Sequence, residues 1–161
     1  MKAAALGGLL LAVCLTGTVQ AQGTYGKWVA RKSLEGYDAI STPATTGGRA
    51  VLDLLCPAGG LSVRMQFGTG LGSVSDEQVR VKLDFDKSGE PPTNWAHAFS
   101  PTNSLLTLAR GRVSTFVAHA KRAAELRVRI TDPLNGPPVD LAFSLEGFPD
   151  ALAVLPCAKG L

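Results

Sequence analysis

The chain has 161 residues, of which 45% are hydrophobic and 18% are charged, and its formal net charge is +3 at pH 7. This mild charge excludes the strongly basic class of nucleic-acid-binding domains, so we expect no nucleic-acid partner. The length suits one domain of ordinary size, which buries about two-thirds of the surface of its unfolded chain and needs no metal or other cofactor to hold it together.

The first 21 residues have the pattern of a secretory signal peptide. Lys2 supplies a positive start, an apolar run follows over 3–16, and Val19-Gln20-Ala21 places small residues at the positions that signal peptidase reads. The run is shorter than the about 20 apolar residues that span a membrane, and no second run follows it. We predict a Sec-type signal over 1–21, cleaved near Ala21, and a single β-rich domain over 22–161. That domain is expected in the periplasm or outside the cell, with no transmembrane segment.

Three cysteines are present, and one of them lies in the predicted signal. Cys14 leaves with the signal, unless Leu11-Ala12-Val13-Cys14 acts as a lipoprotein lipobox, in which Val13 would replace the usual Gly, Ala or Ser. Cys56 and Cys157 remain, and two cysteines in an oxidising compartment predict one disulfide. A redox role usually requires a Cys-x-x-Cys pair, which this sequence lacks.

In chain order, the mature sequence is dominated by strand patterns. Strict alternation of apolar and polar residues predicts strands over 61–67, 79–86, 126–130 and 139–146. Weaker strand patterns cover 27–32, 50–56 and 105–109. The segment 94–99 is strand-like or a loop, and the small polar residues of 37–49 indicate a loop or an edge strand.

Two segments have helical spacing. Val113, Phe116, Val117 and Ala120 recur at i, i+3, i+4 and i+7, which predicts one amphipathic helix within 111–124. A short C-terminal helix is expected over 148–155, with Pro149 in its first turn.

These elements predict a mainly β fold of about six to eight strands. The short turns between strands favour antiparallel pairing. The apolar faces of at least four strands need cover, and one helix shields only part of one sheet. We therefore expect an antiparallel sandwich or a strongly curved sheet, with the two helices and one disulfide.

No catalytic motif stands out from this sequence. A nucleophile turn of the Gly-x-Ser-x-Gly type is absent, and His97 and His119 have no metal-ligand spacing. Asp84 and Asp86 could share one strand face as an acid/base pair or a calcium site, although any solvated strand shows the same alternation. We predict a non-enzymatic binding or accessory protein. The alternatives are a periplasmic hydrolase with a scattered active site that includes His97, and a periplasmic inhibitor or ligand-binding protein.

Two surface features are candidates for contact with an envelope protein partner. Outward basic residues would form a cationic stripe if their strands are neighbours, and otherwise belong to an ordinary solvated face. An exposed aromatic edge around Trp95 is the second candidate. The basic residues are Arg64, Arg80, Lys82, Arg127 and Arg129.

Several features of the mature sequence follow one another in a distinctive order. They are Gly26-Lys27-Trp28, the strand, cysteine and turn over 54–63, the strand 79–84, Trp95, the helix leading into 126–130, and the closing run 142–148 followed by Ala151-Leu152 and Cys157. This order resembles the VasI/TagO-like group of exported bacterial proteins associated with type VI secretion. This resemblance implies an accessory role in the envelope. It brings no catalytic residues, and the oligomeric state stays open.

Overall fold

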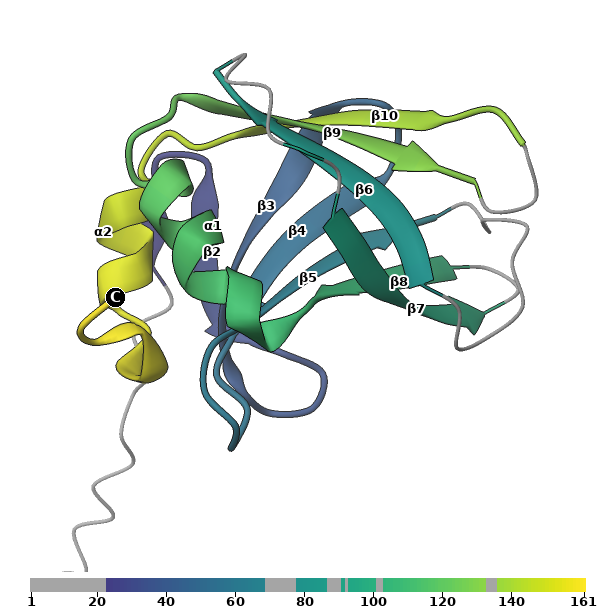
Figure 1. Cartoon of the computed structure of the whole chain (residues 1–161). Coiled ribbons are helices and arrows are strands. Elements are labelled where there is room, and N and C mark those ends of the chain that lie inside the picture. The colour runs from purple at the N-terminus through teal and green to yellow at the C-terminus, as the bar shows by residue number, and fades with distance from the viewer. Residues whose placement is uncertain (1–22, 69–77, 87–90, 92, 101–102, 133–135) are drawn as a thin grey trace, which may run out of the picture.

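The computed structural model describes residues 23–68, 78–86, 91, 93–100, 103–132 and 136–161. These residues form ten strands and two α-helices, so the chain is mainly β (Figure 1). The strands are β1 (Thr24–Tyr25), β2 (Trp28–Lys32), β3 (Asp38–Thr46), β4 (Ala50–Leu55), β5 (Ser62–Phe67), β6 (Gln78–Phe85), β7 (Thr93–Ser100), β8 (Asn103–Leu108), β9 (Glu125–Thr131) and β10 (Val139–Ser144). The helices are α1 (Val113–Ala120) and α2 (Phe148–Ala153), and 3₁₀ turns cover Arg110–Arg112 and Pro156–Ala158.

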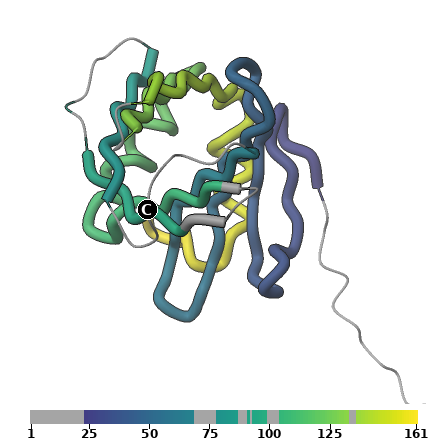
Figure 2. The backbone as a smooth tube through the Cα atoms, turned by 90° about the vertical axis from the view of Figure 1, so that its right-hand side faces the viewer, coloured from purple at the N-terminus to yellow at the C-terminus, as the bar shows by residue number. Residues whose placement is uncertain are grey.

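Eight of these strands close into an antiparallel barrel. They pair in the order β3, β10, β9, β6, β7, β8, β5 and β4, and β4 then pairs with β3. Figure 2 shows the strands arranged as a ring. The predicted sandwich or curved sheet is therefore wrong, because the hydrogen-bonded ladder runs around the whole ring and leaves no two separate sheets. β1 and β2 lie outside the ring and join it through β3.

β3 is the strand that closes the ring. Its first half pairs with β2 and β4, and its second half pairs with β10. The expectation of a loop or edge strand over 37–49 is wrong for a physical reason. Ala39, Ile40, Ser41 and Thr42 are buried one after another. A strand covered on both faces loses the alternation by which a half-exposed strand is recognised.

The interior of the barrel is filled by side chains from every strand of the ring. The largest fully buried ones include Trp95, Phe143, Met65 and Leu106. Three buried polar side chains also point inward, from β3, β7 and β8: Thr42, His97 and Ser104. For the side chains that the structure describes, the barrel is a packed core, as expected of an eight-stranded ring.

α1 covers one end of the barrel with the apolar face that its spacing predicts. Val113, Phe116, Val117 and Ala120 are buried, and the ring of Phe116 lies 5.5 Å from that of Phe85 in an edge-on arrangement. The helix ends at Ala120, before the expected limit at residue 124.

Asp86 stabilises the turn that leads from α1 into β9. This residue directly follows β6 and has a φ of 50°, and its carboxylate accepts hydrogen bonds from the backbone N–H groups of Ala124 and Glu125, each at 2.9 Å. Asp86, suggested from the sequence as one member of a carboxylate pair with Asp84, therefore serves as a backbone cap.

The N-terminal hairpin packs against the start of α2 through two glycines. Gly147 precedes α2 with a φ of 80°, and a Cβ there would lie 2.3 Å from the carbonyl oxygen of Tyr25. A Cβ on Gly26 would lie 2.4 Å from the carbonyl oxygen of Glu146. This close approach brings the rings of Trp28 and Phe148 to 5.0 Å from each other.

The predicted disulfide is present. Cys56, just after β4, is bonded to Cys157, and 101 residues separate them in sequence. The bond ties the C-terminal segment to the barrel next to the connection between β4 and β5. Among the residues that the structure describes, no helix combines the length and apolar character needed to cross a bilayer.

We expect Gly147→Ala to lower the free energy of unfolding by about 2 to 3 kcal/mol, because it combines a left-handed φ with a backbone clash. Gly160→Ala is the matched control, since Gly160 has a φ of 92° but nothing within 4 Å of an added Cβ. Chemical denaturation measures both variants. Equal losses of stability in the two variants would show that the close approach of Gly147 to the turn at Tyr25 does not contribute to the stability of the fold.

We expect the double variant Cys56→Ser/Cys157→Ser to lose about 4 to 5 kcal/mol of stability, because the disulfide closes a loop of about 100 residues. The melting temperature of the wild-type protein should fall in reductant, and that of the variant should not change. Identical denaturation midpoints for the oxidised wild type and the variant would contradict this expectation.

Candidate functional site

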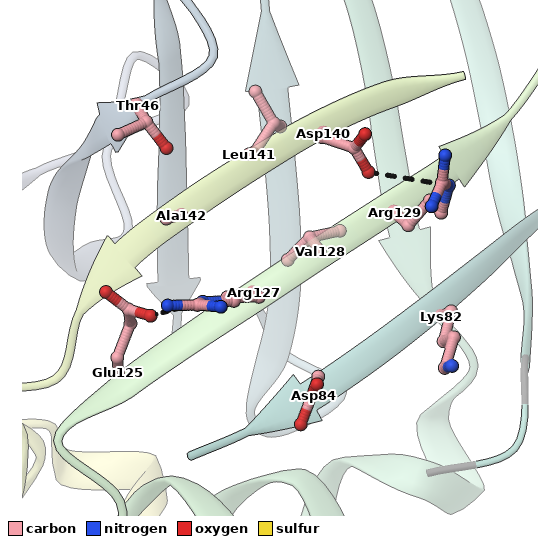
Figure 3. A pocket seen from close by; sticks show the side chains of 10 residues that line it. All are labelled: Thr46, Lys82, Asp84, Glu125, Arg127, Val128, Arg129, Asp140, Leu141 and Ala142. Atoms are coloured by element: carbon pink, nitrogen blue, oxygen red, sulfur yellow. Dashed lines mark hydrogen bonds and ion pairs between the residues drawn. The ribbon is translucent and has the colours of Figure 1, made fainter. Parts of the chain in front are cut away.

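A groove crosses the outer face of β6, β9 and β10. Its volume is about 380 Å³, and its walls are mostly charged side chains (Figure 3). Ala142 contributes only a methyl group, which leaves space between the longer side chains around it. The lining residues are Thr46, Lys82, Asp84, Glu125, Arg127, Val128, Arg129, Asp140, Leu141 and Ala142.

The register of the three strands sets the order of the charges. Lys82 lies opposite Arg129, and Arg129 lies opposite Asp140, so these three form one row across the face. In the next row toward α1, Asp84 lies opposite Arg127. Arg129 and Lys82 appear at one end of the groove and Glu125 at the other, on the right and left of Figure 3.

The two ends of the groove therefore differ in charge. Arg80 is exposed on β6 one row beyond Lys82, so the end away from α1 carries three cations, Arg80, Lys82 and Arg129, beside one carboxylate, Asp140. The end near α1 carries two carboxylates, Asp84 and Glu125, beside Arg127. The face as a whole is of mixed charge, with its positive part at one end.

Two ion pairs lie inside the groove. Arg127 Nε donates a hydrogen bond to Glu125 Oε1 at 2.5 Å, and Arg129 Nε lies 3.5 Å from Asp140 Oδ1. The hydrogen bond to Glu125, together with the charge of that carboxylate, raises the pKa of Arg127. The four side chains are between 43% and 64% exposed, so the pairs contribute little to stability and can open when a ligand competes for them.

Arg64 lies apart from the other four basic residues of the expected stripe. It is on β5, which is four strands away from β9 in either direction around the ring. Its guanidinium pairs with Glu35 at 3.1 Å. Hydrogen bonds from the backbone of Glu35 and from Ser33, together with the charge of Arg64, hold the pKa of Glu35 below its usual value. Alternation along a strand tells which face a residue occupies, but the order of strands around the barrel decides which residues meet.

The expectation that Trp95 forms an exposed aromatic edge is wrong. Its side chain is 0% exposed, inside the barrel, and its indole N–H donates a hydrogen bond to Thr93 Oγ1 at 3.1 Å. The strand pattern of 94–99 was too short to show which of its residues face inward.

The two histidines lie in different places. His97 is 3% exposed and points into the barrel, as does Ser104 on the neighbouring strand β8. His119 lies on α1, where its ring packs edge-on against Phe85 at 5.5 Å. A hydrolase that used His97 and Ser104 would have to admit its substrate into the barrel.

No metal site appears in the part of the chain that the structure describes, where no three His, Cys, Asp or Glu side chains gather in a suitable cluster. Sequence reasoning did not place four polar residues in this groove: Thr46, Glu125, Asp140 and Asp84. Of these, Asp84 was considered only as a partner of Asp86. Each of the three acidic residues alternates with apolar residues on its strand, which shows only that it faces outward. The pairing of β9 with both β6 and β10 brings the three together, and the sequence pattern does not show that pairing.

The chain matches no known protein-family model and no curated protein sequence. Its fold is similar to the crystal structure of invasion associated protein B from Bartonella henselae, with a TM-score of 0.61 and 18% sequence identity. The match covers 81% of this chain and 92% of the other. At this identity, the similarity establishes a common fold.

We expect Trp95→Ala to lower the free energy of unfolding by about 3 to 5 kcal/mol, because it removes a fully buried indole from the barrel. Arg80→Ala, at an exposed position on β6, should change it by less than about 0.5 kcal/mol. Urea unfolding measures both. A Trp95→Ala variant as stable as Arg80→Ala would mean that the indole does not fill the core.

Proposed function

We propose that this protein is an exported, non-enzymatic accessory protein of the bacterial envelope, which binds a protein partner on the outer face of β6, β9 and β10. The signal-peptide pattern over 1–21 supports the periplasm or the exterior as its location. The disulfide supports folding in an oxidising compartment.

The observation that carries this proposal is the groove itself. It lies on regular strands of a closed barrel, so the β-ladder fixes the backbone positions from which its charged side chains project. Long, exposed, flexible charges on a rigid base favour partner recognition through charge complementarity. The described side chains inside the barrel are packed, which favours a contact on the outer surface.

The proposed link with type VI secretion rests on the order of features in the sequence. The structural neighbour, which is named for an association with invasion, contributes a similar fold to this proposal and nothing on secretion. The partner captured from the native envelope tests the link.

The competing proposal is a periplasmic hydrolase. Its support is that His97 and Ser104 point inward from adjacent strands. Turnover of ester or amide substrates by the purified protein, lost in His97→Ala, would favour that alternative.

Crosslinking and pull-down from the native envelope test the proposed surface. We expect Arg127→Glu/Arg129→Glu to lose a partner that the wild-type protein captures, because two cations of the groove become anions. Lys32→Glu is the matched control: Lys32 is an exposed cation paired with Asp38 at 2.9 Å, on β2 and outside the groove. Equal capture by all three proteins would show that the partner binds elsewhere, and a captured type VI component would support the secretion role.

A further inference from the structure

Lys82 and Arg129 form a like-charge pair directly across two strands. They are register partners in the ladder between β6 and β9, and both are exposed on the outer face. Residues directly opposite each other have Cβ atoms about 5 Å apart, and like charges at such positions destabilise the pairing of the strands. The pair therefore opposes folding unless a negative group neutralises it.

The neighbouring carboxylates neutralise this pair only in part. Asp140 lies 3.5 Å from Arg129, on the side away from Lys82, because β9 runs between β10 and β6. Asp84 lies opposite Arg127, one row nearer α1. Arg80, next to Lys82 on the same face of β6, adds a further positive charge.

We propose that Lys82 and Arg129 together bind a carboxylate from an acidic segment of a protein partner, at the positive end of the groove. This inference rests on the proposed function and gives the chemistry of its partner. One or two acidic side chains fit the space of about 380 Å³, and the carboxylates Asp84 and Glu125 exclude further negative charge from the other end.

A protein segment fits this face better than an anionic membrane. Three carboxylates, Asp84, Glu125 and Asp140, stand around the same groove and would repel a flat anionic surface. The large apolar side chains that are exposed in the described part of the chain lie on other elements, so none is placed to insert into lipid beside the groove. They are Val29, Leu34, Val154 and Leu161.

Fluorescence anisotropy with a labelled peptide of alternating glutamate and alanine tests the inference on the purified mature protein. We expect binding that weakens as salt rises past about 0.15 M, where screening reaches about 8 Å. The same peptide with glutamine in place of glutamate should not bind. Lys82→Gln and Arg129→Gln should each weaken binding at least fivefold, and Lys32→Gln should leave it unchanged.

Lys82→Glu separates binding from folding. It places a carboxylate opposite Arg129, so we expect a higher melting temperature together with loss of peptide binding. A general folding defect would lower both the melting temperature and the binding of the peptide. If Lys82→Glu reduced stability, Lys82→Gln would still report on binding without adding a negative charge.

Three results would overturn the inference: no binding of the acidic peptide, binding by Lys82→Gln and Arg129→Gln as tight as that of the wild-type protein, or preferential binding of phosphatidylglycerol vesicles. Failure here and failure of the proposed function are distinguishable. A partner captured through the groove without acidic-peptide binding refutes only the carboxylate contact, whereas peptide binding without any captured partner refutes only the envelope partner.

Discussion

The closure of the barrel at β3 is the constraint on which the rest of the structure depends. An open sheet of these strands would leave backbone N–H and C=O groups unpaired along two edges, where other chains could add. β3 removes those edges from the ring by pairing with β4 on one side and with β10 on the other. Four successive residues of β3, at positions 39–42, are buried, so both faces of the closing strand are covered.

Closure also decides the chemistry of the outer surface. Successive residues of a strand point to opposite faces, so a shift of one residue between β6 and β9 would turn the charged side chains inward and the apolar ones outward. With Val81, Leu83 and Val128 buried in the core, that shift is excluded. The register that packs the core is therefore the same register that places Lys82 opposite Arg129.

The N-terminal hairpin of β1 and β2 and the C-terminal segment with α2 lie outside the ring, and a backbone approach and a disulfide hold them in place. Gly26 and Gly147 let two turns approach within a distance that any side chain would prevent, and the disulfide joins Cys56 to Cys157. Gly147 also lies in the closing run 142–148, which contributed to the sequence resemblance. Its role in this chain is structural, because a Cβ at this position would meet the backbone of Tyr25.

The local elements follow from the sequence because their causes are local. Alternation identified the strands around Met65, Leu83 and Val128, helical spacing identified α1, and the two cysteines outside the predicted signal peptide identified the disulfide. The barrel, the burial of Trp95 and the separation of Arg64 from the groove depend on which strands become neighbours. Pairing such as that of β3 with β10 joins residues about 100 positions apart, and no short-range pattern encodes it. The sequence by itself thus determined the half-exposed strands, α1, the disulfide and the faces of the charged residues on those strands, and only the tertiary structure decided which charges meet.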